Sequence, residues 1–502
     1  MGQEVLIWAR FLLYLQRQIN TKPAMKTETL IGRKTEIAEI QNCIKSDRSE
    51  FVILYGRRRI GKTFLVKKYF DGKFDFHFVG ASRHTTPQQL EDFGKSLAKY
   101  ADTDIQTPRN WSDALDMLAR HLESINKKRK KIIFIDEMPW IDRKQSDFVA
   151  ALEHFWNSWA AMRDDIVLIA CGSATSWMIK NLVKNKGGLH NRVTRRIYLR
   201  PFTLNETEQY LRNKGFVWQR TQIMQCYMVL GGVPYYLSLL DRHLSLPQNI
   251  DNLFFRQGAL LQNEFEDLYN ALFPSADKYI NIVKALSTKQ KGLTRDEIIS
   301  ATNYQGGSLT TILNNLENCD FIECYNQYGS KKKNMIYKIV DFYTLFYFRY
   351  IDGNRTKDEE YWQHTFSTSS VAAWQGISFE LLCRCHLPQI KHALGISGVA
   401  TKTASWKYIP PQNSNEQGTQ IDMVIERIDK MIHLCEMKFR DRKFAIDKSY
   451  ADTINRRADI FKEKTQTSCQ VVNTIVTPVG LTSSKYNTLI HSIITADDLF
   501  AK

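Results

Sequence analysis

Short apolar runs alternate with longer segments of helical period in the first half of the chain. Between residues 51 and 203, runs rich in β-branched and aromatic residues are separated by segments in which apolar residues recur every three or four positions. The runs are FVILYG (51–56), FDFHFVGA (74–81), KIIFIDE (131–137), IVLIACGS (166–173) and RIYLRPF (196–202). Such alternation is typical of parallel strands joined by crossover helices, so it predicts a doubly wound α/β sheet.

The pattern becomes helical after residue 203. Thr203 and Glu206 have the spacing of a capping box, and no strand-like run follows before about residue 275, which predicts a helical lid. Three short helical segments and a hairpin then follow, in the order of a winged helix-turn-helix. They are YINIVKALST (279–288), TRDEIISATN (294–303), SLTTILNNLENCDFI (308–322) and IECYNQYGSKKKNMIYKIV (322–340), with Gly329 and Lys331 to Lys333 at the hairpin turn.

The last third of the chain predicts a second α/β unit. An aromatic segment at 341–355 is expected to pack between domains, and a helix at 372–387 precedes strands at about 419–426 and 431–437. The predicted organisation is an N-terminal extension (1–27), an α/β domain (28–203), a lid (204–276), a winged helix with an aromatic linker (277–355) and a C-terminal α/β domain (356–502).

The first apolar stretch does not predict a membrane span. VLIWARFLLYLQRQI at 5–19 is interrupted by Arg10 and Arg17 and is too short to cross a bilayer. We interpret it as a helical or disordered extension, with a chain start near Met25 as one explanation and a surface-lying amphipathic helix as an alternative. No membrane partner is therefore expected.

The net charge indicates which kind of molecule the protein binds, and the cysteine content indicates the cell compartment it suits. The 502 residues contain 69 Lys and Arg against 53 Asp and Glu, and the net charge of +16 favours an anionic partner such as DNA or a nucleotide. A basic surface that only aids solubility is the alternative. The nine cysteines include no CxxC pair, which argues against a zinc site, and their odd number suits a reducing cytoplasm.

The stretch GRRRIGKT (56–63) carries the clearest chemistry. It fits GxxxxGKT, follows a predicted strand and precedes a predicted helix. Gly56 and Gly61 leave room for backbone amides to face phosphate oxygens at a helix N-terminus. Lys62 would reach the β and γ phosphates of ATP, and Thr63 would ligate Mg²⁺.

A second motif supplies the residues that hydrolysis requires. The buried run IIFIDE ends in Asp136, predicted near the magnesium, and Glu137, predicted to orient and deprotonate the attacking water. Ser173, after the next run, is a candidate contact to the γ phosphate or the water, although a serine there often caps a helix. Arg192 is the preferred arginine finger among Arg192, Arg195 and Arg196, and such arginines can equally face solvent or nucleic acid.

These residues resemble the archaeal-type ATPase family of AAA-like and STAND-like P-loop proteins. GRRRIGKT, IIFIDE, the GGVP turn (231–234) and the upstream LIGRKTEI (30–37) match the family's motifs, and the resemblance covers about residues 28–350. It implies adenine recognition near Ile31, Gly32 and Arg33, and it implies that Pro234 lies against the nucleotide from the lid. Arg57 to Arg59 occupy variable positions of the loop, so we expect them to contact the lid, another domain or an anionic partner.

Acidic residues and a lysine recur on the two predicted C-terminal strands. Asp422 and Glu436 can face each other across a hairpin, and Lys438 shares a face with Glu436, as a divalent metal and an attacking water require. Glu380 lies in a mainly apolar helix, where a carboxylate needs a metal or another cation. An exposed hairpin with charges that alternate by chance is the alternative.

This arrangement resembles the PD-(D/E)xK nuclease fold, in the form of the domain that often follows archaeal-type ATPase modules. The resemblance implies that Glu380, Asp422 and Glu436 are metal ligands and that Lys438 is the catalytic lysine. Ile421 stands where the motif has proline, which lowers the specificity of the match. A nuclease fold that binds without cutting stays open.

The leading hypothesis is an ATPase with ATP and Mg²⁺ as cofactors whose nucleotide state controls a DNA-binding, nuclease-like module. One alternative is a regulatory switch in which the C-terminal domain only binds a partner, and another is a winged-helix transcription regulator. An arginine finger that acts between copies of the chain would require a homo-oligomer.

Overall fold

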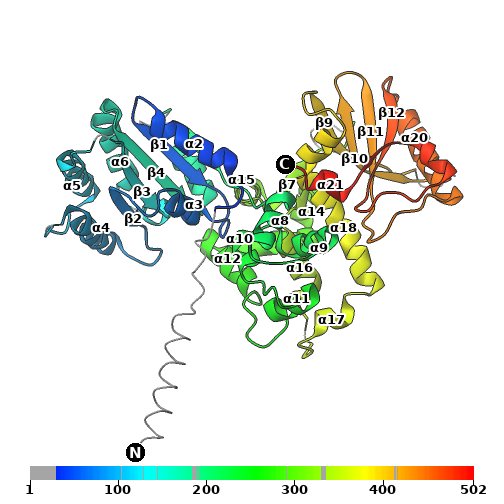
Figure 1. Ribbon diagram of the computed structural model, residues 1–502, viewed down its shortest axis with the longest axis horizontal. Coiled ribbons are helices and arrows are strands. Elements are labelled where there is room, and N and C mark those ends of the chain that lie inside the picture. The colour runs from blue at the N-terminus through cyan, green and yellow to red at the C-terminus, as the bar shows by residue number, and fades with distance from the viewer. Residues whose placement is uncertain are drawn as a thin grey trace, which may run out of the picture.

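The structure is a computed structural model that describes residues 30–502, except 103, 128, 144, 184–188, 190, 290, 330–334, 355, 412–413 and 415. The predicted N-terminal extension and the lysines at 331–333 therefore lie outside the described residues. Figure 1 shows one sheet at each end of the molecule, with the helices of the middle of the chain between them. None of the described helices is long and apolar enough to cross a membrane.

The first sheet is parallel and has the strand order β2-β3-β4-β1-β5. Its strands are β1 (Glu50–Tyr55), β2 (Phe76–Val79), β3 (Lys131–Asp136), β4 (Ile166–Gly172) and β5 (Arg195–Tyr198). The surrounding helices are α2 (Lys34–Lys45), α3 (Lys62–Tyr69), α4 (Thr86–Ala101), α5 (Trp111–Ser124), α6 (Phe148–Ser158) and α7 (Thr175–Met178). Every predicted strand of this region is present.

Alternate side chains of the central strands enter two separate cores. Phe51 and Ile53 pack with residues of α4, α5 and α6, whereas Val52 and Leu54 pack with residues of α2 and α3. Because successive strand residues point to opposite faces, helices must cover both faces of this sheet. The predicted doubly wound α/β architecture is confirmed.

The lid follows the first sheet, and its described residues form helices and no strand. They are α8 (Leu204–Asn213), α9 (Arg220–Leu230), α10 (Pro234–Ser238), α11 (Leu246–Phe254) and α12 (Glu264–Leu272). The predicted capping box starts α8: the Glu206 backbone N–H donates to Thr203 Oγ1 over 3.2 Å, and the Thr203 N–H donates to the Glu206 carboxylate over 2.9 Å. These bonds satisfy two N–H groups that a helix terminus would otherwise leave free.

A three-helix unit comes next, with α13 (Ala276–Ser287), α14 (Arg295–Thr302) and α15 (Gly306–Asn318). Its small antiparallel sheet has the order β6-β8-β7, formed by β6 (Leu293–Thr294), β7 (Ile322–Tyr325) and β8 (Ile336–Ile339). The elements follow the predicted order, and β7 and β8 with the described residues between them, 326–329 and 335, are called the hairpin below.

Aromatic side chains join the lid helices to the C-terminal region. Phe346 in α16 (Phe342–Phe346) lies 4.9 Å from the ring of Phe254 in α11 and 5.0 Å from that of Trp362 in α17 (Tyr361–Thr365). Trp374 of α18 (Ser369–Cys385) completes the cluster. The aromatic segment packs between domains, as the sequence predicts.

The C-terminal sheet is mixed and has the order β13-β12-β11-β10-β9. Its strands are β9 (Thr401–Tyr408), β10 (Thr419–Arg427), β11 (Met431–Met437), β12 (Gln470–Val476) and β13 (Ile490–Ile494), and its other helices are α19 (Leu387–Ala393), α20 (Lys448–Thr465) and α21 (Ala496–Leu499). The predicted strands at 419–426 and 431–437 correspond to β10 and β11, which pair antiparallel.

Candidate functional site

The loop from Gly56 to Gly61 turns sharply between β1 and α3. Gly56 has φ +142° and Gly61 has φ +85°, backbone conformations that side chains with a Cβ rarely adopt. Lys62 begins α3, and its ammonium donates to the carbonyl oxygens of Gly56 (2.9 Å) and Arg57 (2.8 Å). Burial lowers the pKa of Lys62. The lysine is thus held inside the loop, where a phosphate oxygen would replace the two carbonyls.

The acidic residues after β3 meet this loop. Thr63 Oγ1 donates to Asp136 Oδ2 over 2.7 Å, because β3 and the loop end at the same edge of the parallel sheet. Glu137 adopts φ +47° directly after the strand. Its Oε2 accepts hydrogen bonds from Ser173 Oγ (2.9 Å) and the Ser173 N–H (3.2 Å). The structure therefore brings together four residues that the sequence analysis predicted for nucleotide chemistry, and it places Ser173 against Glu137.

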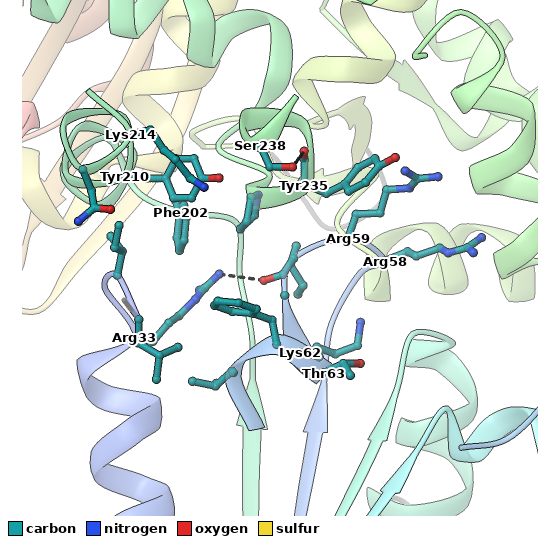
Figure 2. Close-up of a pocket in the computed structure, with 18 of the residues that line it drawn as sticks. Arg33, Arg58, Arg59, Lys62, Thr63, Phe202, Tyr210, Lys214, Tyr235 and Ser238 are labelled. Carbon is teal, nitrogen blue, oxygen red and sulfur yellow. Dashed lines mark hydrogen bonds between the residues drawn. The ribbon is translucent and has the colours of Figure 1, made fainter. Parts of the chain in front are cut away.

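A cavity of about 460 Å³ opens between the loop, the entry segment and the lid helices (Figure 2). Ile31, Arg33, Lys62, Thr63, Glu137 and Pro234 all line it. The Arg33 guanidinium spans the cavity wall, donating to Arg200 O (2.7 Å) and Ile60 O (3.2 Å). The backbone N–H of Arg33 donates to Glu206 Oε1 (3.1 Å), which connects the entry segment to the capping box of α8. The volume lies within the range of small-molecule sites.

Four aromatic residues that line the cavity, Phe64, Phe202, Tyr210 and Tyr235, were missed by the sequence analysis. The Arg33 guanidinium stacks against the Phe202 ring, with Cζ 4.7 Å from the ring centroid, and Tyr210 and Tyr235 line the lid side of the cavity. Their positions carry a usable signal, since Phe202 directly precedes the capping box and Tyr235 directly follows Pro234. Flat apolar surfaces of this kind suit a nucleobase.

Arg192 is exposed and is not among the residues that line the cavity. It precedes β5, and the Thr194 N–H bonds to Phe51 O at the beginning of β1, whereas the phosphate-binding loop follows the end of β1. Arg192 therefore lies at the edge of the sheet away from the cavity of its own chain. Its role as an arginine finger stays a prediction, and it would require a second copy of the chain.

Two of the loop arginines contact other parts of the chain, as expected. Arg57 is 2% exposed and forms a 2.5 Å ion pair with Asp341, at the start of α16. Arg59 forms a 2.6 Å ion pair with Glu264 of α12 and lies 4.2 Å from the ring centroid of Tyr235. Burial alone would lower the pKa of Arg57, but Asp341 outweighs it and the pKa is raised. The loop is thereby fixed to the lid helices and to the segment after the hairpin.

Glu380 lies on α18, Asp422 on β10 and Glu436 on β11, and Lys438 directly follows β11. Met423 pairs with Cys435, so the next pair in this register brings Asp422 opposite Glu436. Glu436 accepts from Lys438 Nζ over 2.6 Å and from the Arg457 guanidinium over 2.5 Å. Burial alone would raise the pKa of Glu436, but Lys438 and Arg457 outweigh it and the pKa is lowered.

Asp422 and Glu380 have a different environment from Glu436. Burial, and then repulsion from Glu436 and Glu380, raise the pKa of Asp422 to about 8. Burial also raises the pKa of Glu380, against the opposing attraction of Lys338 on β8. Within the described ranges, no three His, Cys, Asp or Glu side chains come together as a group that could hold a metal ion. Glu436 is held by Lys438 and Arg457, and the metal-ligand roles of Glu380, Asp422 and Glu436 stay predictions.

A parallel sheet of this strand order, with a glycine-rich loop, a lysine, a threonine and two acidic residues at one edge, defines a P-loop nucleotide-binding domain. Residues 30–240 match the model of a family described as an ATPase domain predominantly from Archaea. The match covers less than half of the chain, and over these residues the chain is similar to an archaeal-type ATPase domain.

Two relatives from Methanocaldococcus jannaschii are similar to the chain. An uncharacterized protein is 24% identical over 425 residues, covering 82% of this chain and 88% of its own length. An uncharacterized ATP-binding protein is 40% identical over 43 residues, covering 9% of this chain and 73% of its own length.

Among solved structures, the Walker-type ATPase of Pyrococcus abyssi has a TM-score of 0.47 and 16% identity, covering 66% of this chain and 99% of its own. The ORC2 protein of Aeropyrum pernix has a TM-score of 0.41 and 13% identity, covering 70% of this chain and 99% of its own. At these scores neither structure bears on what the chain binds.

Proposed function

We propose that this protein binds ATP between the loop and the lid helices and hydrolyses it at Glu137. The observation that carries this proposal is the juxtaposition of Lys62, Thr63, Asp136 and Glu137 beside a cavity with aromatic walls. A basic turn without a ligand would not need two acidic residues and a buried lysine at the same sheet edge.

Each residue has a distinct task in this proposal. Lys62 exchanges its two loop carbonyls for phosphate oxygens, and the backbone N–H groups at the start of α3 bind the same phosphates. The Thr63 hydroxyl and the Asp136 carboxylate suit Mg²⁺, which neutralises charge on the phosphates when bound. Glu137 turns from Ser173 to the attacking water and accepts its proton while the water oxygen bonds to the γ phosphorus and the bond from that phosphorus to the ADP oxygen breaks. Glu137 then passes the proton to solvent and returns to Ser173 after product release.

Two variants separate binding from hydrolysis. Lys62→Ala is expected to weaken ATP binding by at least about a hundredfold, because the cation that faces the phosphates is lost. Glu137→Gln is expected to bind ATP with the affinity of the unaltered protein and to hydrolyse it at least about a hundredfold more slowly. Calorimetric ATP titration and single-turnover phosphate release measure the two effects. Full hydrolysis by either variant would refute the assignment.

We further propose that the C-terminal domain is a nuclease-like module and that it acts on DNA together with the winged helix. Its activity would depend on whether ATP is bound at the loop. The support is the ion pair between Arg57 of the nucleotide loop and Asp341, together with the net charge of +16. Magnesium- or manganese-dependent DNA cleavage by the full chain, lost in Asp422→Ala and Lys438→Ala, is the expected result. Cleavage that persists in both variants would contradict these assignments.

A second candidate is a regulatory ATPase whose C-terminal domain binds a partner without cutting. The observation that favours it is Glu436, which already has two cationic partners in Lys438 and Arg457. If the chain cuts neither DNA nor RNA with either metal, with or without ATP, this candidate replaces the nuclease-like function.

A further inference from the structure

The hairpin of the three-helix unit docks onto the C-terminal domain. Gln327 forms a β-bridge with Ser405 of β9, and the Tyr328 N–H donates to Ser405 O over 2.8 Å. The Tyr328 ring packs 5.3 Å from that of Phe461 in α20. A wing in this position already uses backbone and aromatic groups to bind its own chain.

Arg384, near the end of α18, holds the same hairpin. Its guanidinium lies 4.7 Å from the ring centroid of Tyr325 and 3.5 Å from the Glu323 carboxylate. Because α18 also carries Glu380, one turn of helix separates a hairpin contact from a carboxylate of the proposed site. Hairpin docking therefore takes place at that site.

A cavity of about 100 Å³ remains between the two domains. Glu380 and Asp422 line it from the C-terminal domain, while Lys338 and Tyr325 line it from the hairpin. Ligand sites for small molecules usually measure at least about 300 Å³. The cavity is therefore too small for a nucleotide unit of a DNA strand while the hairpin stays docked.

We propose that the hairpin is an autoinhibitory plug, with Lys338 as the cation that faces Glu380 and Asp422 in the closed state. The proposal rests on the proposed assignment of these two carboxylates to the site of the C-terminal domain. Glu380 lies in an apolar setting, where a carboxylate needs a cationic partner, and Lys338 is a cation close enough to attract it. A divalent cation and Lys338 would then compete for the same negative charge.

The base of the plug is fixed to the nucleotide-binding domain. Asp341, two residues after β8, pairs with Arg57, and the Arg57 guanidinium also lies 5.3 Å from the ring centroid of Phe321, just before β7. Asp320 accepts a hydrogen bond from the Tyr198 hydroxyl at the end of β5. Both ends of the hairpin thus contact the edge of the sheet that carries the nucleotide loop, while Lys338 and Tyr325 line the cavity that also holds the carboxylates of Glu380 and Asp422. Figure 1 shows β7 and α15 between the two sheets.

The test compares two lysines that line the same cavity. Lys338→Met removes the hairpin ammonium and keeps its stem, and Lys407→Met does the same on β9, as the matched control. Hydrogen exchange of the peptide 322–329 in the full chain is expected to be roughly tenfold faster in Lys338→Met, the effect of losing one partly screened charge contact. Exchange in Lys407→Met and in the charge-preserving Lys338→Arg is expected to match that of the unaltered chain.

Mn²⁺ titration of the same proteins separates the plug from the proposed metal-dependent function. Faster exchange together with roughly tenfold tighter Mn²⁺ binding in Lys338→Met, lost on adding Asp422→Asn, supports both. Faster exchange without Mn²⁺ binding in any variant supports the plug and contradicts the metal-ligand assignment. Equal exchange in Lys338→Met and Lys407→Met overturns the plug, whatever the metal does. Retained ATP binding shows that the nucleotide-binding domain of each variant is folded, and unchanged exchange of β11 and β12 shows the same for the C-terminal sheet.

Discussion

Replacement of Arg57 by methionine tests the link between the nucleotide loop and the hairpin. Arg57 and Asp341 are 284 residues apart in the chain, and their side chains are 3% and 1% exposed. Asp341 also accepts hydrogen bonds from the Thr344 N–H (3.0 Å) and the Thr344 hydroxyl (2.6 Å). Arg57→Met keeps those two bonds, so it leaves a buried carboxylate that has lost its cation.

The size of the effect follows from this burial. Removal of one partner of a buried ion pair costs about 3–5 kcal/mol, because the remaining charge stays desolvated and unpaired. At about 1.4 kcal/mol per factor of ten, local opening around Asp341 should become roughly 140 to 4,000 times more frequent. The unaltered pair should therefore protect α16 and the base of the hairpin strongly.

Native-state hydrogen exchange of residues 341–346 measures this opening within a chain of several domains. Lys73→Met serves as the control, because Lys73 pairs with Asp71 over 2.9 Å while both side chains are about four-fifths exposed. Its exchange rates are expected to be unchanged. Rates in Arg57→Met within threefold of the unaltered protein would refute the view that this pair holds the hairpin base to the loop.

Two other variants test the nucleotide loop and the joint between lid and C-terminal domain. Gly56→Ala is expected to weaken ATP binding at least about tenfold by calorimetry, because a Cβ at φ +142° would lie 2.3 Å from Leu199 O. Gly307→Ala is the control and should bind ATP normally, because the space around its Cβ is open. Unchanged ATP affinity in Gly56→Ala would contradict the loop geometry. His386 accepts from the Leu204 N–H (2.9 Å), and burial lowers its pKa to about 4, below the unfolded value near 6.5. The unfolded chain therefore binds the proton first as pH falls, so stability is fully present above about pH 6.5 and decreases by up to roughly 3 kcal/mol toward pH 4. His386→Asn should flatten this decrease in denaturant titrations between pH 4 and 7, and an unchanged slope would exclude His386 as its source.

Strands that are buried on both faces could be predicted from the sequence because nearly all of their residues are apolar. Each apolar run from FVILYG to RIYLRPF became a strand of the first sheet, and the residues after them met at one edge because parallel strands share a direction. By contrast, β9 (TKTASWKY) was not predicted. Its side chains are mostly half-exposed, so the strand lacks an apolar run and depends on pairing with β10.

Contacts between domains could not be predicted from local patterns. Lys338 lies in the run IYKIV, where alternation indicates only a strand, and its position near Glu380 follows from how the hairpin docks. The pairing of Arg57 with Asp341 likewise depends on tertiary packing. Both residues are charged and buried, so each needs a partner of opposite charge, but the sequence does not say which residue that is. The four C-terminal candidate residues could be named from the sequence, but the hairpin that lies beside Glu380 and Asp422 could not.

In the function proposed above, nucleotide at the loop controls access to the C-terminal carboxylates. The most direct measurement is hydrogen exchange of residues 322–329 in Glu137→Gln, with and without saturating ATP and Mg²⁺. Lys62→Ala with the same ATP concentration serves as the control that does not bind nucleotide. Of these three samples, only Glu137→Gln with ATP is expected to show faster hydrogen exchange of the hairpin. Identical exchange in all three samples would contradict it.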